Sequence, residues 1–408
     1  MKYPMSVVKL KASLARYRAI RGLSSLLLLG RPTSDRVYLW PPFGPEDGGE
    51  LNESRQSCLH YLHNLDIVVC YFRRDQDGLT RHLFDVAHDT NMETGRTDQR
   101  SMEVELKRAK YCAVWKYGTR PRAQSLTPHL YIVVNTEGGH FGSQDWLRLV
   151  SNLYRTRFPL KARRVEFPTE LGSCAILGSG PSVERFVEER GQWDGWIGAN
   201  FLVCDERIWQ GCNPIAICLA DPMCFSPLPA FHAMRTRLFQ RVLSTHAALV
   251  TFNEYAPFIE LNFPENIKRR CHYVQSLGQD SYRLTTRFRA KDLTVTRYGN
   301  VLTDLMLPLA ASLSRKITLY GCDGMPPGAM RMPKSASMDE YDIAILEKFP
   351  KLLEGFQAYI DNVSVYTGFV VDECRTHGLE ITLRCRSWNS GLSSLPVWAE
   401  TGTAFPNA

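Results

Sequence analysis

The stretch SCAILGSGPSVERF, residues 173–186, joins an apolar, strand-like run to glycines, serines and a proline. The candidate phosphate-binding residues in it are Gly178, Ser179, Gly180 and Ser182. Glycines after a strand let the backbone approach a ligand, and the start of the next helix offers N–H groups to an anion. Pro181 suits the first helical position. A tight strand–helix turn explains the same residues, since GxGPS lacks the GxGxxG spacing and the Walker lysine.

Polar residues also stand where other predicted strands end. Asn200 follows the run GWIGA, and Asp221 follows an apolar run in LADPMCF. Asp323 ends ITLYGCDG, and the pair Gly299-Asn300 precedes a helix-like segment. Asn suits hydrogen bonding to a ribose or base edge, and an acid at the carboxyl end of a parallel strand lies where ligands of such sheets bind. A loop, turn or helix cap explains each position alone, but their convergence on one sheet edge favours a ligand site.

The order of these motifs resembles that of bacterial sialyltransferases of the GT42 type and of the related DUF115, or motility-accessory-factor, glycosyltransferases. The resemblance covers roughly residues 173–390. It implies a CMP-activated nonulosonic acid (sialic acid, pseudaminic acid, legionaminic acid or a Kdo-like sugar) as donor. It also implies a glycan or glycolipid acceptor and a single inverting displacement in which CMP leaves. No metal ion and no further cofactor are required in that scheme.

The resemblance assigns roles to the motif residues. The loop at 178–180 would face the CMP phosphate and ribose. Asn200 and Asp221 would contact the nucleotide, and Gly299-Asn300 would lie on the phosphate side. The sialyltransferases tend to have Asn at the two positions that are Ser179 and Asp221 here, and the Asp-Pro form is closer to the DUF115 branch.

The catalytic base of the sialyltransferases is a His in the helical segment after the GxD strand, and this chain departs from that pattern. No His lies between Asp323 and Thr376. Asp361, in YIDN, is the candidate base, because a carboxylate can deprotonate an attacking hydroxyl. His377 is the other candidate, and Asp323 completes the catalytic set. A helix-surface position for Asp361 and a helix C-terminal cap for His377 are the structural alternatives.

Two other patterns raise the question of a metal. Asp75-Gln76-Asp77 is a DxD arrangement of the kind that holds Mg²⁺ against a diphosphate, although Asp-Gly also forms a plain turn. Cys58, His60 and His63 are potential soft-metal ligands without a matching second pair. Neither pattern outweighs its structural explanation. No GxSxG, HExxH or Cys₄ pattern is present.

Alternating strand-like and helix-like segments must position these residues. The expected strands lie at 37–40, 66–72, 111–115, 131–134, 173–177, 195–198, 215–219, 248–252, 316–320 and 379–385, and the expected helices at 145–157, 301–313 and 339–376. The alternation predicts an α/β protein with a doubly wound, mostly parallel, Rossmann-like sheet. With a second N-terminal α/β domain, it predicts the two-lobed arrangement of GT-A or GT-B enzymes.

The basic link FPLKARRVEFPTELG, residues 158–172, separates the two parts. We expect an N-terminal α/β domain at 1–160 that holds the acceptor or is accessory, a nucleotide-sugar-binding domain at 170–390, and a tail at 391–408. The net charge of +7 is spread out, and it suits an anionic ligand or membrane surface rather than nucleic acid. Patches at 120–122 and 161–164 have that character.

The twelve scattered cysteines and the lack of a long apolar run predict a cytoplasmic protein, with peripheral contact to the inner membrane compatible with its charge. A cytoplasmic CMP-sugar glycosyltransferase is the leading hypothesis. A pterin pyrophosphokinase that uses ATP and Mg²⁺, an activity of some DUF115-like proteins, is the second. A non-catalytic nucleotide-binding module is the third.

Overall fold

The computed structural model divides the chain into two compact units, Met1–Leu153 and Tyr154–Ala408. Each unit is described by itself below. The residues that the structure describes are 34–40, 68–85, 90–114, 131–133, 151, 154, 158–159, 163–168, 170–211, 213–221, 232–277, 293–297, 299–327, 329, 331, 333–335, 338 and 356–398.

The first unit contains a six-stranded mixed sheet in the order β4-β3-β2-β1-β5-β6. Its strands are β1 (Ser34–Trp40), β2 (Val68–Asp75), β3 (Gly78–Asp85), β4 (Thr90–Thr97), β5 (Ala109–Val114) and β6 (Tyr131–Val133). Strands β2, β1, β5 and β6 pair in parallel, whereas β2, β3 and β4 pair antiparallel. Sequence reasoning anticipated the parallel strands and missed β3 and β4, which carry many polar residues.

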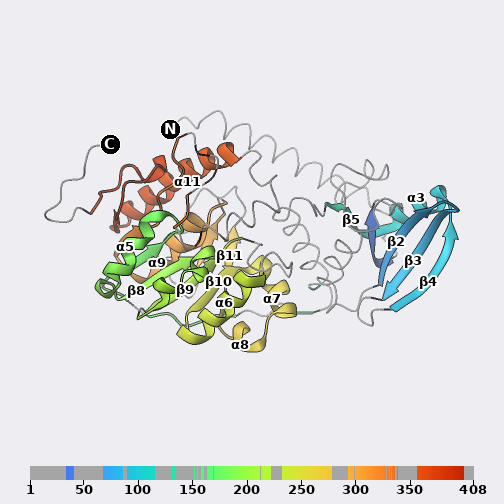
Figure 1. Ribbon diagram of the computed structural model, residues 1–408, viewed down its shortest axis with the longest axis horizontal. Helices are drawn as coiled ribbons and strands as arrows, with labels where there is room; N and C mark the ends of the chain where they lie inside the picture. Colours follow the sequence, from blue (N-terminus) through green and yellow to red (C-terminus); the bar gives the residue numbers. More distant parts are fainter. Residues whose placement is uncertain are drawn as a thin grey trace. The chain divides into compact units, whose positions relative to one another are not determined.

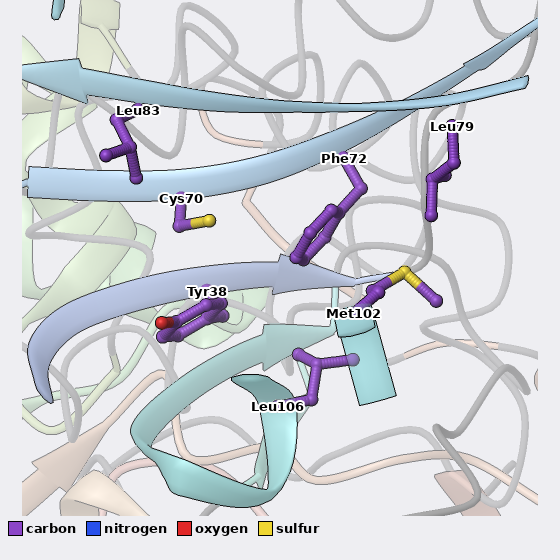
Figure 2. Packing of buried hydrophobic residues seen from close by; sticks show 7 residues of the cluster. All are labelled: Tyr38, Cys70, Phe72, Leu79, Leu83, Met102 and Leu106. Atoms are coloured by element: carbon purple, nitrogen blue, oxygen red, sulfur yellow. The ribbon is translucent and has the colours of Figure 1, made fainter. Parts of the chain in front are cut away.

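The described core of this unit lies between the sheet and helix α3 (Gln99–Arg108) (Figure 2). It comprises Tyr38, Cys70, Phe72, Leu79, Leu83, Met102 and Leu106. Asp98 caps the helix, since its carboxylate accepts hydrogen bonds from the Ser101 amide at 2.8 Å and hydroxyl at 3.1 Å. These bonds lower the pKa of Asp98. The cap fixes where the chain leaves β4 and enters the helix.

The second unit is built on an eight-stranded, all-parallel sheet in the order β12-β11-β10-β9-β8-β7-β13-β14. The strands are β7 (Cys174–Leu177), β8 (Gly195–Ala199), β9 (Pro214–Leu219), β10 (Ala248–Phe252), β11 (Cys271–Leu277), β12 (Thr294–Thr296), β13 (Lys316–Tyr320) and β14 (Glu380–Leu383). Every residue of β7 to β10 is buried, which is why these strands read as continuous apolar runs.

Helices accompany this sheet, and Figure 1 shows α6 and α7 beside β9 and β10. The helices are α5 (Glu184–Glu189), α6 (His232–Thr245), α7 (Ala256–Asn262), α8 (Glu265–Lys268), α9 (Leu307–Leu313) and α11 (Phe356–Thr376). A short 3₁₀ helix, η4 (Pro181–Val183), precedes α5, and a π-helical turn, η12 (Leu302–Met306), precedes α9. The predicted α/β class and parallel sheet are confirmed for this unit, although β11 and β12 were missed. Within the described residues, no helix has both the length and the apolar character needed to cross a bilayer.

The strand order places a switch point between β7 and β13. From β7 the chain adds β8 through β12 on one side, and it then returns to add β13 and β14 on the other side of β7. Crossover loops diverge at such a point, and ligands of parallel sheets bind there, outside the carboxyl ends of the strands. The residues after Leu177 and Tyr320 therefore flank the most favourable position for a ligand site on this sheet.

Candidate functional site

The loops that follow β7 and β13 are packed backbone against backbone. The Gly178 amide donates to the Tyr320 carbonyl at 2.7 Å, and the Gly180 amide donates to the Gly321 carbonyl at 2.9 Å. A Cβ atom on Gly178 would lie 2.3 Å from the Gly321 oxygen, and one on Gly321 would lie 2.2 Å from the Gly178 oxygen. No side chain fits at either position. These glycines are therefore required by the contact between the two loops.

Asp323 joins this contact through its carboxylate. Its Oδ2 accepts hydrogen bonds from the Ser182 amide at 3.1 Å and the Ser182 hydroxyl at 3.0 Å. The same hydroxyl accepts from the Gly321 amide at 2.8 Å, and a Cβ atom on Gly180 would lie 2.1 Å from Asp323 Oδ2. Burial raises the pKa of Asp323, while the bonds from Ser182 act in the opposite direction. We call Gly178, Gly180, Ser182, Gly321 and Asp323 the loop lock.

The loop lock satisfies the backbone groups at the start of η4. Ser182 donates to Asp323, and Val183 donates to the Gly180 carbonyl at 3.1 Å. Pro181 has no N–H to offer. The tight turn considered as the alternative for this stretch is thus present. Four of the predicted site residues, namely Gly178, Gly180, Ser182 and Asp323, act in it as structural partners of one another.

Ser179 lies at the tip of the first loop, beside a cation that sequence reasoning missed. The Lys334 ammonium is 3.0 Å from the Ser179 hydroxyl oxygen. The Ser335 amide donates to the Ser179 carbonyl at 3.0 Å, which holds the lysine-bearing segment against the loop. Lys334 is half-buried. It stands in the stretch RMPKS, which has no periodicity or motif, so nothing in the sequence separates it from an ordinary surface lysine.

Asn200 follows β8, the neighbour of β7, and has an unusual backbone. Its φ angle is +46°, in the left-handed region that non-glycine residues seldom adopt. Asn tolerates this region better than most residues, but the conformation still costs on the order of 1 kcal/mol. Such strain concentrates at functional sites. Asn200 is half-buried and belongs to the same carboxyl edge as the loop lock.

The predicted pair Gly299-Asn300 begins the η12 helical turn. The Asn300 side chain accepts from the Leu302 amide at 2.7 Å, so it satisfies a backbone donor at the start of this turn. The Gly299 amide donates at 3.0 Å to the carboxylate of Asp304, which is 1% exposed. Gly299 has a φ of +93°, which a side chain would strain. Both predicted residues therefore have a structural role at this position.

Tyr359, at the start of α11, bonds to this turn. The Tyr359 hydroxyl donates to the Gly299 carbonyl at 2.7 Å. The residue is 39% exposed, but desolvation, followed by the negative charges of Asp221 and Asp304, raises the pKa of Tyr359, so the phenol remains a hydrogen-bond donor at neutral pH. Asp221 is half-buried after β9, at the same edge of the sheet. Sequence reasoning missed Tyr359 and Asp304.

Arg297 is a further cation at the carboxyl edge. Its guanidinium lies 4.3 Å from the ring centroid of Phe252 and forms an ion pair with Glu254. It also donates to the Tyr255 hydroxyl at 3.3 Å, and that hydroxyl donates to the Ala220 carbonyl at 3.4 Å. The carboxylate of Glu254 balances its charge. Arg297 therefore ties the ends of β9, β10 and β12 together.

The two predicted bases lie at different ends of α11. Asp361 is exposed in the second turn, and it lies two residues beyond Tyr359, so it points to a different side of the helix. His377 follows the last turn, where its Nδ1 is 2.8 Å from the Glu373 carbonyl oxygen. It precedes β14, whose first residue pairs with the first residue of β13. His377 therefore lies at the amino edge of the sheet, away from the other predicted site residues.

The predicted metal patterns are only partly described. Asp75 and Gly78 pair across the β2–β3 hairpin, so the DxD residues form its turn. Cys58, His60 and His63 lie outside the described residues, as do the patch at 120–122 and the first two residues of the patch at 161–164. Among the residues described, no group of three or more His, Cys, Asp or Glu side chains is arranged to hold a metal ion.

Cys322 lies between Gly321 and Asp323 in the chain. Burial, with the neighbouring Asp323 charge, raises the pKa of the Cys322 thiol to about 12. At neutral pH it is therefore protonated and a poor nucleophile. The other side chains described at this edge are hydroxyls, carboxylates, a phenol, an amide, an arginine and a lysine.

No family model matches the chain, and neither the curated proteins nor the solved structures give a match. A functional assignment therefore depends on the geometry of the edge between β9 and β13.

Proposed function

We propose that the second unit binds a nucleoside phosphate outside the carboxyl ends of β7 and β13. We further propose that the protein is a glycosyltransferase that uses a CMP-activated nonulosonic acid as donor. The reversal of strand order beside β7 supports a doubly wound, Rossmann-like interpretation of this unit. In this proposal the first unit holds the acceptor or is accessory, and the enzyme works at the cytoplasmic face of the inner membrane.

One observation carries the proposal: the Lys334 ammonium stands beside the Ser179 hydroxyl at the switch point. Lysine is a common phosphate ligand in nucleotide sites, where it acts as a point charge. A hydroxyl adds a donor for a phosphate oxygen. Because the loop lock fixes the Ser179 backbone, the two groups are held in place before a ligand arrives, which lowers the cost of ordering them.

The proposed reaction is a single displacement at the anomeric carbon. The acceptor oxygen forms the new bond while the bond from the anomeric carbon to the CMP phosphate oxygen breaks with its electron pair. Lys334 stabilises the negative charge that develops on the departing phosphate. Asn200 and Asp221, at the ends of β8 and β9, contact the nucleotide in this scheme.

Asp361 is the proposed base that takes the proton of the acceptor hydroxyl. Helix α11 begins at the carboxyl edge, where Tyr359 bonds to Gly299, and the Asp361 carboxylate, on another side of that helix, is exposed. His377 is left out because it lies at the opposite edge of the sheet. Replacing Asp361 with Ala is expected to abolish sugar transfer while CMP still binds. Retained turnover would eliminate Asp361 as the base.

Thermal-shift measurements on the full chain with CMP, UDP, ATP and S-adenosylmethionine, each with and without Mg²⁺, test the proposal. CMP without metal is expected to raise Tm, because a ligand that binds only the folded state stabilises it. Lys334→Met is expected to lose this shift while it keeps the Tm of the ligand-free protein. A response to ATP–Mg²⁺ alone would overturn the proposal and favour the pterin pyrophosphokinase alternative.

A further inference from the structure

Trp388 lies directly beside the loop lock and is mostly in solvent. Its side chain is 61% exposed, the largest fraction among the exposed large hydrophobic residues of the described chain. Its amide donates to the Asp323 carbonyl at 2.6 Å. An indole left in water exposes a large apolar surface whose burial would be favourable. The exposed Trp388 ring lies at a candidate ligand site, so a bound ligand is one way in which its apolar surface could be covered.

The backbone around Trp388 is held from the side of the loop lock. The Ser387 hydroxyl donates to the Cys322 carbonyl at 2.5 Å, and the Asn389 amide donates to that hydroxyl at 3.1 Å. Gly324 packs so closely that an added Cβ would lie 2.5 Å from the Asn389 nitrogen. Residues 387–389 are therefore attached to the loop that follows β13.

Helix α11 holds the same segment from the other side. The Asn389 side chain accepts from the Gly391 amide at 2.9 Å, which starts a short 3₁₀ helix, η14 (Ser390–Leu392). An added Cβ on Gly391 would lie 2.1 Å from the Ser364 carbonyl oxygen. The segment is thus wedged between a loop and a helix. Only the side-chain torsions of Trp388 remain to be set when a ligand arrives, so little conformational entropy is lost on binding.

The other tryptophans described in this unit have aromatic or cationic neighbours, whereas no such contact of the Trp388 ring occurs among the described residues. Trp196 packs edge-on against Trp209 with centroids 4.9 Å apart. Trp398, although 42% exposed, meets Trp193 at 5.9 Å and lies under the Arg384 guanidinium at 5.1 Å. Packing therefore accounts for those rings and leaves Trp388 unexplained.

We propose that Trp388 is the stacking platform for the nucleobase of the bound nucleotide, an inference that rests on the proposed function. Ser179 and the neighbouring Lys334 ammonium lie on the β7 side of the loop lock. Trp388 lies on the β13 side, where its amide donates to the Asp323 carbonyl. A nucleotide that spans the switch point would place its phosphate at the first and its base at the second. Stacking uses the flat face that all bases share, so it contributes affinity without selecting the base.

Calorimetric titration of the full chain with CMP and with AMP tests this proposal, alongside tryptophan fluorescence. Trp388→Ala is expected to raise Kd for both nucleotides roughly tenfold. If the base stacks on Trp388, CMP is expected to quench the fluorescence of the unaltered chain. Trp388→Phe, which keeps a flat ring, is expected to stay within a few-fold of the unaltered Kd but to lose this quenching. Trp398→Phe is the matched control, and it should keep both the Kd and the quenching.

The outcomes separate this inference from the function on which it rests. If CMP binds the unaltered chain and Trp388→Ala leaves Kd unchanged, the stacking role is wrong and the nucleotide site stands. Quenching that persists in Trp388→Phe would also overturn it. If neither nucleotide binds the unaltered chain, the proposed function fails, and the stacking role fails with it. Circular dichroism of each variant checks that the fold is intact.

Discussion

Glu189 and Asp323 are two half-buried carboxyl groups beside the same strand, β13, and their pKa values shift in opposite directions. Burial favours the protonated form of Glu189, but hydrogen bonds from Arg384 and the Tyr320 hydroxyl lower the pKa below its ordinary value. Asp323 receives its bonds from Ser182, which is neutral, and burial raises its pKa. A full positive charge in contact offsets the desolvation of a carboxylate, and neutral donors do so only in part.

The surroundings of the two groups explain the difference. Arg384 is 3% exposed, and its Nε is 2.8 Å from the Glu189 carboxylate. Its Nη1 donates to the Trp398 carbonyl at 2.8 Å, and Tyr320 donates to Glu189 at 2.6 Å. This network is built entirely from protein groups that satisfy one another. Asp323 instead belongs to an edge with a nearby lysine and an exposed tryptophan, so it lies where a ligand can change its surroundings.

The largest effect is expected from Gly180→Ala, which tests whether the loop lock is as rigid as its contacts indicate. The new Cβ would lie 2.1 Å from Asp323 Oδ2 and 2.9 Å from the Gly321 carbonyl oxygen, so the Asp323 carboxylate must turn away from Ser182 and the two loops must shift. We expect the free energy of unfolding to fall by about 3 kcal/mol, because the turned carboxylate also loses its bonds from Ser182. Gly191→Ala is the control, because nothing lies within 4 Å of its added Cβ. Urea unfolding of both variants measures the difference, and equal stabilities would show that the lock is loose.

Arg384→Met is expected to have an effect of the same order, because it leaves the Glu189 carboxylate without its cation. Breaking a buried ion pair from one side costs about 3–5 kcal/mol. The double variant Arg384→Met with Glu189→Met should recover part of this loss, since no unpaired charge remains. Thermal unfolding of the single and double variants checks the prediction. A double variant as unstable as the single one would contradict it.

The pH dependence of stability should separate the two carboxyl groups. The pKa of Glu189 lies below its ordinary value of 4.5, so its contribution is present above that pH and is lost as the pH falls. The pKa of Asp323 lies above its ordinary value of 3.8, so its contribution is present below that pH and is lost as the pH rises. The stability difference from the unaltered chain should therefore grow with pH for Glu189→Gln and shrink for Asp323→Asn. Denaturant titrations between about pH 3 and pH 7 measure these slopes, and slopes of the same sign would contradict the comparison.

The smallest effect is expected for His377→Ala. His377 is exposed and lies at the amino edge of the sheet. Its loss should change the free energy of unfolding by less than about 0.5 kcal/mol and should leave the Kd for CMP unchanged. Calorimetry with CMP provides the check. A weakened affinity would mean that the amino edge takes part in binding.

Much of the second sheet could be predicted because its central strands are buried on both faces. CAIL, PIAICL and ALVTF are continuous apolar runs, and the structure turns all three into strands. By contrast, β11 has the sequence CHYVQSL, and its polar residues interrupt the apolar pattern from which a buried strand is predicted. Its His272 is 2% exposed, and the ring accepts from the Val165 amide at 3.2 Å, a partner 107 residues away. Such a pairing has no local signature.

The candidate site was predictable in place but not in detail. Strand ends can be read from the apolar runs, so the edge that carries Asn200, Asp221 and Asp323 could be anticipated. The roles of its residues depend on contacts between distant segments. Ser179 and Lys334 are 155 residues apart, and the Trp388 backbone depends on Asp323. The sequence suggested that Gly178 and Gly180 let the backbone approach a ligand or form a tight turn, whereas the structure shows that both pack against the loop after β13.

The place of β7 in the strand order also bears on how the chain is synthesised. β7 is the first strand of the second sheet to leave the ribosome, and one of its edges pairs with β8 soon afterwards. Its other edge pairs with β13, which is synthesised much later. Likewise, Asp323, the partner of Ser182, follows it by 141 residues in the chain. A nascent chain therefore carries an unpaired, apolar strand edge for most of the translation of this unit, a state prone to aggregation. The topology that creates the switch point therefore also predicts an aggregation-prone stage during synthesis.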